Sequence, residues 1–219
     1  LERALFFLNE NGCVQTDAFY SYSEASYAIK PTYLNCIGCA FASKKYNLLT
    51  EMYDFYRQAV DLASDSLRMG IAYNLIAREI QPTRRPKDSN NKDYVTSSQE
   101  FVDWKNDMET GVNYYIKVLD FADALLNSTS IDERNIPAQA AMTLGNLKYW
   151  LAHGNVSPAE CQEAIDYYNL ALKINPEIEI ESAVDRVKKL ENDINNALLK
   201  RKTKIAPGYS KREIESYLS

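Results

Sequence analysis

The chain has 219 residues and a formal net charge of −5, and only 7 residues are glycine and 7 are proline. Glycine and proline together reach about half of their average usage, which argues against a turn-rich all-β fold and against disorder, and favours long helices. The acidic balance disfavours nucleic acid as a partner, because contacts to phosphate need lysine and arginine.

Helix signals begin at the start of the chain. We expect helices over residues 1–11, 16–29, 32–45, 48–64 and 66–80, with stops at Asn11-Gly12 and Pro31. Residues 81–99 are polar and hold two prolines, so they predict an exposed loop. No stretch approaches the run of about 18 apolar residues that a membrane-spanning helix needs, so we expect no membrane insertion.

The second half of the chain continues this pattern. A long helix is expected over 99–127 and a connector over 128–135, after which Pro137 suits the first turn of a helix over 137–153. A further helix is expected over 158–174. After Pro176, apolar residues recur every three or four positions to about residue 202, which predicts an amphipathic helix. Residues 203–219 are expected to be a flexible tail.

A tyrosine motif recurs along the chain. It has a small residue, a tyrosine four positions later and a small or β-branched residue three positions after that, with Met52 as a larger first residue in one copy. These spacings place the three side chains on one helix face, where tyrosine can fill the gap between neighbouring helices. The copies are Ala18-Tyr22-Ala25, Met52-Tyr56-Ala59, Gly111-Tyr115-Val118 and Ala164-Tyr168-Ala171.

Glycines inside predicted helices form a second repeated feature. Gly38, Gly70 and Gly145 each stand in a helix interior, where glycine costs about 1 kcal/mol relative to alanine. Retaining glycine there predicts close packing against a neighbouring helix. The tyrosine motif returns after 34 residues between Ala18 and Met52, and the glycine returns after 32 residues between Gly38 and Gly70.

The clearest unit joins LGNLKYW, residues 144–150, to EAIDYYNLALKINPE, residues 163–177. This unit resembles a tetratricopeptide repeat, whose period is about 34 residues. Lys148 stands where the family usually has an aromatic residue, and about seven extra residues separate the two helices. The resemblance implies an all-α fold: a right-handed α-solenoid of about four helix pairs over residues 1–176, closed by a capping helix over 177–202.

The resemblance also implies a binding site, because the family binds a peptide or protein on the concave face lined by its first helices. Asn146 stands where many members use asparagine to hold the backbone of the partner. The alternative is that the side chains expected on the concave face instead face neighbouring helices or cover an internal gap. The residues expected on the concave face are Asn35, Cys36, Cys39, Leu67, Arg68, Ile71, Asn74, Met142, Thr143, Asn146, Tyr149 and Trp150.

One known variant of this site does not fit the sequence. One subfamily binds acidic chaperone tails through a clamp of lysine, asparagine and arginine residues. Asn35, Cys39 and Ile71 occupy clamp-like positions where that clamp would need a different set, so we expect no chaperone-tail binding.

Cofactor chemistry finds little support in the sequence. Cys36 and Cys39 form a C-x-x-C pair, but a zinc site needs two further ligands, and only Cys13, Cys161 and His153 remain as soft candidates. A single histidine makes catalytic triads hard to build, and no nucleotide-binding motif occurs. We therefore expect no enzyme activity, no cofactor and a packing role for the two cysteines.

The sequence predicts a non-catalytic scaffold or adaptor that binds protein or peptide. Four cysteines interpreted as free thiols indicate a reducing, cytoplasmic location. Three alternatives remain open: a structural subunit of a larger assembly, a metal or redox protein using Cys36 and Cys39, and a helical protein whose tyrosines and tryptophans stack on sugars or bases.

Overall fold

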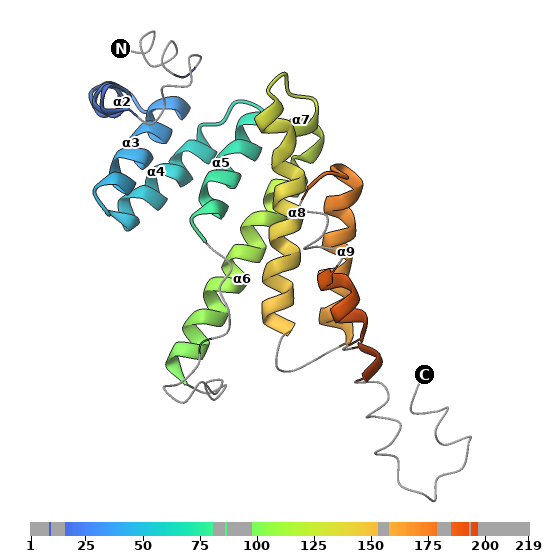
Figure 1. The fold of residues 1–219 in the computed structure, drawn as a ribbon. Helices are drawn as coiled ribbons and strands as arrows, with labels where there is room; N and C mark the ends of the chain where they lie inside the picture. The colour runs from blue at the N-terminus through green and yellow to red at the C-terminus, as the bar shows by residue number, and fades with distance from the viewer. Residues whose placement is uncertain are drawn as a thin grey trace, which may run out of the picture. The chain divides into compact units, whose positions relative to one another are not determined.

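Figure 1 shows the fold in a computed structural model, which describes residues 16–80, 98–152, 158–178, 185–192 and 194–196, with the single positions 9 and 86. All regular structure within these ranges is helical and none is strand, which confirms the all-α prediction there. The expected helix over 1–11 and loop over 81–99 lie outside the described residues apart from isolated positions, and the tail over 203–219 lies outside them entirely.

The first half of the chain follows the predicted helices closely. Helices α2 (Asp17–Ile29), α3 (Tyr33–Lys45), α4 (Leu49–Asp61) and α5 (Ser66–Arg78) lie within three residues of the expected bounds. Three of them begin at a side chain that accepts a hydrogen bond from the backbone N–H three positions later, which satisfies a free donor of the first turn. These N-cap residues are Thr16, Thr32 and Asp65.

The expected long helix over 99–127 is wrong, because it divides at Phe121 into α6 (Gln99–Asp120) and α7 (Ala122–Leu126). At the break, the Phe121 backbone N–H donates to the Val118 carbonyl at 3.1 Å, a tighter turn than that of an α-helix. The Phe121 ring stacks on Tyr73 of α5 with ring centroids 5.9 Å apart. Neither proline nor glycine stands at Phe121, so the usual helix-breaking residues do not mark this break in the sequence.

The next helix begins earlier than expected. Helix α8 (Ile131–Ala152) contains Pro137 in its interior, whereas the sequence analysis placed Pro137 in the first turn. The Ser130 hydroxyl accepts a hydrogen bond from the Glu133 N–H at 3.5 Å, and the Glu133 carboxylate accepts one from the Ser128 hydroxyl. Serine followed three positions later by glutamate is the spacing of a capping box, which is the signal for the true start of the helix.

The remaining described residues add two helical segments. Helix α9 (Pro158–Ile174) matches the predicted helix over 158–174. Residues 185–192 are helical within the expected capping helix over 177–202, and we call them the 185–192 helix. None of the helices in the described part of the chain has the length and apolar character that a membrane-spanning helix needs.

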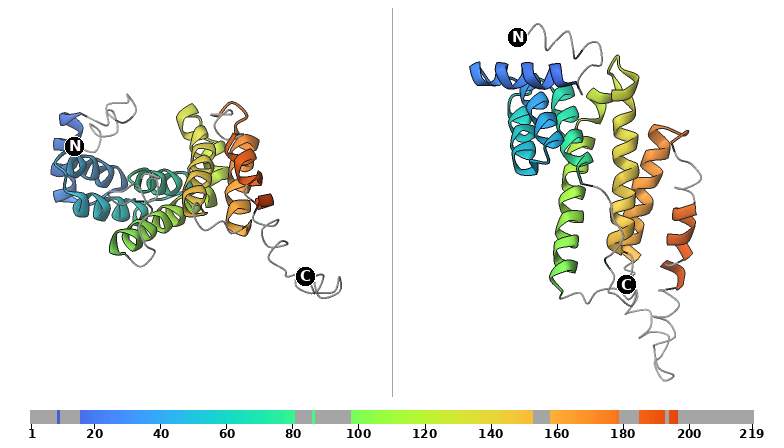
Figure 2. Two further views of the ribbon diagram at one scale, coloured as in Figure 1. Left: turned by 60° about the horizontal axis from the view of Figure 1, so that its bottom comes forward. Right: turned by 60° about the vertical axis from the view of Figure 1, so that its left-hand side comes forward.

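The chain forms two compact units. The N-terminal unit comprises Leu1–Gln81 with Thr110–Ala140, and the C-terminal unit comprises Pro82–Glu109 with Ala141–Ser219. Within the N-terminal unit α2 packs against α3, α3 against α4, α4 against α5, and α5 against α7. Helices close in sequence are therefore neighbours in space, as Figure 2 shows for α2 to α5.

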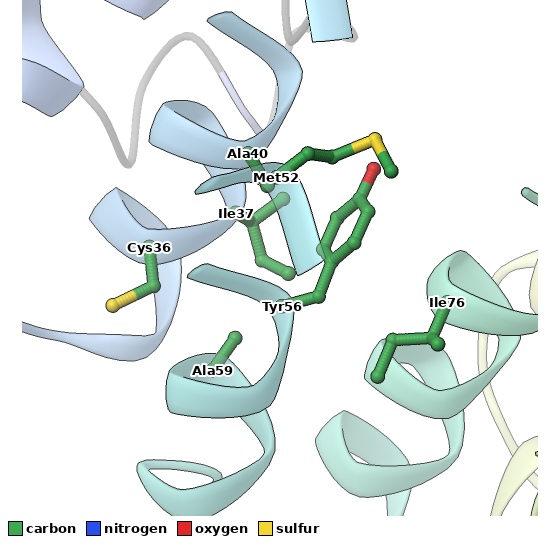
Figure 3. Packing of buried hydrophobic residues seen from close by; sticks show 7 residues of the cluster. All are labelled: Cys36, Ile37, Ala40, Met52, Tyr56, Ala59 and Ile76. Atoms are coloured by element: carbon green, nitrogen blue, oxygen red, sulfur yellow. The ribbon is translucent and has the colours of Figure 1, made fainter. Parts of the chain in front are cut away.

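The core of the N-terminal unit lies between α3, α4 and α5. Figure 3 shows the ring of Tyr56 between residues of α3 and Ile76 of α5, with the Met52 side chain beside its hydroxyl end. Tyrosine therefore fills the space between helices in this copy of the motif, as predicted. The buried cluster comprises Cys36, Ile37, Ala40, Met52, Tyr56, Ala59 and Ile76.

Three of the four tyrosine motifs are buried as predicted, and the first is not. In α2 the buried side chains are Phe19, Ser23 and Ser26, so the same spacing of four and three is kept but displaced by one residue. The expected triplet Ala18-Tyr22-Ala25 is exposed, with Tyr22 at 42%. A spacing pattern alone does not distinguish two adjacent registers on one helix.

The three helical glycines lie against neighbouring side chains, which confirms the prediction of close packing. A Cβ atom added at Gly38 would stand 1.8 Å from the Ser23 hydroxyl oxygen of α2. One added at Gly145 of α8 would stand 2.7 Å from the Tyr168 ring of α9, and one at Gly70 would stand 3.0 Å from Leu125 of α7. Each glycine therefore permits an approach that a larger residue would obstruct.

Candidate partner-binding face

The candidate site is the face of α8 formed by Met142, Thr143, Asn146, Tyr149 and Trp150, which we call the α8 face. All five belong to the C-terminal unit, and their spacing places them along one side of the helix. Met142 and Tyr149 are buried, whereas Thr143, Asn146 and Trp150 are half-buried. The face therefore combines an apolar base with polar and aromatic groups that remain partly accessible.

Asn146 is the centre of a hydrogen-bond network. Its side-chain oxygen accepts a hydrogen bond from the Tyr168 hydroxyl of α9 at 2.9 Å and a second from the Arg186 guanidinium of the 185–192 helix. An amide oxygen has two lone pairs, so these two donors use both. Asn146 thus links α8, α9 and the 185–192 helix.

Tyr149 makes the second polar contact to the same helix. Its hydroxyl accepts a hydrogen bond from the Lys189 ammonium at 2.9 Å. The ammonium also lies 5.6 Å from the centre of the Tyr149 ring. The Tyr149 and Trp150 rings meet edge to face, with centroids 4.9 Å apart and planes at 76°. Tyr149 therefore holds both the neighbouring tryptophan and the 185–192 helix.

Lys148 makes an ion pair between α8 and α9. Its ammonium lies 2.6 Å from the Glu163 carboxylate, so an ion pair connects α8 to α9. Both side chains are partly accessible to water, so the pair contributes at most about 1 kcal/mol.

Asn35, expected on the concave face, is fully buried in the N-terminal unit. Its side-chain oxygen accepts a hydrogen bond from the Thr32 N–H at 2.7 Å, which completes a capping box at the start of α3. Its amide nitrogen donates to the Lys30 carbonyl at 2.8 Å and to the Ser26 hydroxyl at 3.3 Å. These bonds close the turn between α2 and α3, so this amide is engaged inside the protein.

Cys36 and Cys39 are also buried on α3. Burial raises the pKa of the Cys36 thiol to about 11. Burial, with smaller contributions from Cys36 and Glu24, raises the pKa of the Cys39 thiol to about 12. Both thiols are therefore protonated at neutral pH, and a protonated thiol is a poor nucleophile and a poor metal ligand.

The residues expected on α5 differ in exposure. Arg68 is exposed, Leu67 and Ile71 are half-buried, and Asn74 is buried. The Arg68 carbonyl accepts a hydrogen bond from the Tyr33 hydroxyl at 3.2 Å, and its guanidinium lies 5.7 Å from the centre of the Tyr33 ring. These contacts connect the first turns of α3 and α5.

Sequence reasoning missed Arg186 and Lys189 as contact residues. The amphipathic pattern after Pro176 includes Leu190 among its apolar residues, but it assigned no contact to the charged residues of this segment. In the structure, Arg186 and Lys189 bind α8, and Leu190 is only 2% exposed. The three stand at positions i, i+3 and i+4, which share one helix face, and that spacing is the signal that could have identified them.

Within the described residues, no three histidine, cysteine or carboxylate side chains gather in a way that could hold a metal ion. Cys13 and His153 lie outside the described residues. No protein-family model, curated protein or solved structure matches this chain. The resemblance to the tetratricopeptide family therefore rests on the residues of the 144–177 unit and the repeated tyrosine and glycine positions.

Proposed function

We propose that this protein is a non-catalytic scaffold that binds a segment of another protein on the α8 face. One observation carries the proposal: Asn146 and Tyr149 of this face hold the 185–192 helix through hydrogen bonds. Binding of an amphipathic helix by side chains on a helical surface is one of the recurring modes of protein recognition. The resemblance to the tetratricopeptide family assigns the same two residues to partner binding.

The proposal includes the finer architecture, in which the helix pairs are tetratricopeptide-like repeats of a right-handed solenoid. Its support is local. Gly145 of α8 packs on the ring of Tyr168, and the Met52, Gly111 and Ala164 copies of the tyrosine motif are buried. The three motif positions are therefore buried in three of the four copies.

The absence of catalysis is also part of the proposal. The thiols of Cys36 and Cys39 are both buried with a raised pKa, and Cys36 belongs to the hydrophobic cluster, which disfavours a redox or metal role for the pair. Zinc analysis of the purified chain beside a Cys36→Ser variant tests this directly. Stoichiometric zinc that the variant loses would contradict a packing role.

The experiment that tests the scaffold function is capture from the source lysate followed by mass spectrometry. Wild type is compared with Trp150→Ala, which removes a half-buried aromatic side chain from the α8 face, and with Tyr46→Ala, which removes an exposed one from the turn between α3 and α4. We expect Trp150→Ala to lose a partner that Tyr46→Ala retains. A partner that both variants retain, with both folded, would contradict binding at the α8 face.

A second candidate function is a structural subunit of an assembly, and an exposed stripe on α2 favours it. Ala18, Tyr22, Ala25 and Ile29 lie along one side of α2, and Ile29 is 78% exposed. The same capture experiment distinguishes the two candidates when Tyr22→Ala/Ile29→Ala is added. A partner lost by this variant and retained by Trp150→Ala would favour the subunit.

A further inference from the structure

The buried and exposed sides of α2 are the reverse of those of an ordinary surface helix. A surface helix turns its apolar side to the core and its polar side to water. In α2, two of the three buried side chains are serines, Ser23 and Ser26. The exposed side is mainly apolar: Ala18, Tyr22, Ala25, Ala28 and Ile29 lie there beside Asp17, Ser21 and Glu24.

Contacts between the serine side of α2 and helix α3 fix this orientation. The Ser23 hydroxyl donates to the Phe19 carbonyl at 2.7 Å and lies where a Cβ atom on Gly38 would stand. The Ser26 hydroxyl accepts a hydrogen bond from the Asn35 amide at 3.3 Å. Rotating α2 to bury its apolar side would break these contacts. The apolar side therefore stays exposed in the described part of the chain, and Figure 2 shows α2 at the outer end of the row α2 to α5.

Helix α4 carries the same motif spacing in the usual orientation. Its Met52, Tyr56 and Ala59 are buried in the core cluster, so the spacing of four and three marks a helix–helix contact there. The exposed side of α4 is charged and includes Glu51, Asp54, Arg57 and Asp61. On α2 the same spacing is exposed and extends by one turn, and we call these residues the α2 stripe: Ala18, Tyr22, Ala25 and Ile29.

The α2 stripe is complementary to itself. Two identical helices that meet across a perpendicular two-fold axis run antiparallel and make each contact twice. With the axis between positions 23 and 24, Tyr22 of one copy lies opposite Ala25 of the other, and Ile29 lies opposite Ala18. Each pair joins a large side chain to a small one, as interdigitating helices require. The spacing of four, three and four residues is that of a coiled-coil seam.

We propose that the α2 stripe is a dimer interface, on which α2 of a second copy of this chain lies antiparallel in this register. The inference does not use the α8 face. It rests on the second candidate function, a subunit of an assembly, and names a second copy of the chain as the partner. Because α2 has only 13 residues, it covers less than the ~800 Å² per partner of a standard stable interface, and we expect a reversible dimer with a Kd of about 10–100 µM.

Sedimentation velocity of the purified full chain over a concentration series tests the pairing. Wild type is compared with Tyr22→Ala/Ile29→Ala, which removes both large side chains of the α2 stripe, and with Tyr46→Ala, which removes an exposed tyrosine outside it. We expect the first variant to dimerise at least about tenfold more weakly, because its large apolar side chains no longer lose contact with water. Tyr46→Ala dimerises like wild type, and circular dichroism confirms that each chain is folded.

Two further variants test the antiparallel register. Ala25→Tyr alone places tyrosines opposite each other, so we expect it to weaken the dimer about tenfold. Tyr22→Ala/Ala25→Tyr exchanges the two residues and keeps every tyrosine opposite an alanine, so we expect its Kd to stay within about threefold of wild type. All these positions are exposed in the single chain, so the substitutions leave its core unchanged.

Three results would overturn the inference. A wild type that remains monomeric throughout the series would leave the α2 stripe to another protein or to residues 1–11 of the same chain. A dimer that Tyr22→Ala/Ile29→Ala retains would place the interface elsewhere. An exchange variant as weak as Ala25→Tyr would contradict the antiparallel register. The assay uses the purified chain alone, so a different protein captured from lysate through the stripe would support the subunit function even if this dimer fails.

Discussion

Two buried tyrosines in equivalent motif positions have opposite hydrogen-bonding states. Tyr168 and Tyr56 are both fully buried. The Tyr168 hydroxyl donates to Asn146, whereas the Tyr56 hydroxyl is buried without a hydrogen-bond partner in the described part of the chain. Burying a hydroxyl without a partner costs about 1–3 kcal/mol, so the same side chain stabilises one helix pair and carries a penalty in the other.

This difference predicts opposite effects of one substitution. We expect Tyr168→Phe to lower the free energy of unfolding by about 1 kcal/mol, because its hydrogen bond is lost while Asn146 retains the Arg186 donor. We expect Tyr56→Phe to raise it by about 1 kcal/mol, because the unpaired hydroxyl is removed. Urea unfolding of both variants beside wild type measures the two changes. A loss of stability in Tyr56→Phe would show that its hydroxyl has a partner, such as an internal water.

At the scale of the element, the distance from each helical glycine to the nearest side chain of the neighbouring helix determines whether alanine is tolerated in its place. At Gly38 an added Cβ would lie 1.8 Å from the Ser23 oxygen and 2.4 Å from the Ser23 Cβ. At Gly70 the nearest atoms are 3.0 Å away and belong to Leu125 and Phe121. Overpacking typically costs 1–3 kcal/mol, whereas alanine gains about 1 kcal/mol over glycine in a helix.

We therefore expect Gly38→Ala to lower the free energy of unfolding by about 3 kcal/mol and Gly70→Ala to leave it nearly unchanged, as measured by urea unfolding. Adding Ser23→Gly to Gly38→Ala removes the clashing side chain and should recover more than half of the loss. No recovery in the double variant would show that the Ser23 side chain is not the source of the strain, and would leave the Phe19 ring, 2.9 Å from the added Cβ, as its source.

Helix positions followed from the sequence where a local signal exists. Thr16 and Thr32 mark the starts of α2 and α3, and the predicted bounds lie within one residue of the observed ones. The break at Phe121 has no local signal in the sequence. It coincides with a ring contact to Tyr73 of another helix, which a local pattern does not reveal. Pro137 gave a misleading signal, because proline is tolerated in the observed α8 interior after a start fixed by Ser130.

At the scale of the whole molecule, predicting the site residues requires knowing which side of each helix packs against a neighbouring helix. Asn35 stands three positions before Gly38 and Asn146 one position after Gly145, so both share a helix side relative to the glycine, yet Asn35 caps α3 and Asn146 binds the 185–192 helix. Composition and spacing give the same expectation for both, since they do not say which helix packs on which. Arg186 was missed for the same reason, because its role depends on a contact between segments 40 residues apart.

Buried ionisable groups give the folded chain a defined response to alkali. An ordinary thiol has a pKa near 9.0, and burial raises the pKa to about 11 for Cys36 and about 12 for Cys39. Between pH 9 and 11 the unfolded chain therefore releases two protons that the folded chain retains. Stability must fall as pH rises through this window, by up to about 1.4 kcal/mol per pH unit for each thiol.

Ionisation of the buried tyrosines lowers the stability of the fold at higher pH than ionisation of the two buried thiols does. Burial also raises the pKa of Tyr33, Tyr56 and Tyr168 above the ordinary value of 10.0, so these groups destabilise the fold mainly above pH 10. Between pH 9 and 10 we expect Cys36→Ala/Cys39→Ala to lose less stability than wild type in urea unfolding, and between pH 7 and 8 we expect equal slopes. The further fall above pH 10 persists in the variant as an internal control, because its tyrosines are intact. If wild type and variant lose stability equally between pH 9 and 10, the two thiols ionise as readily in the folded chain as in the unfolded one. That result would contradict the raised pKa that follows from the burial of both thiols on α3.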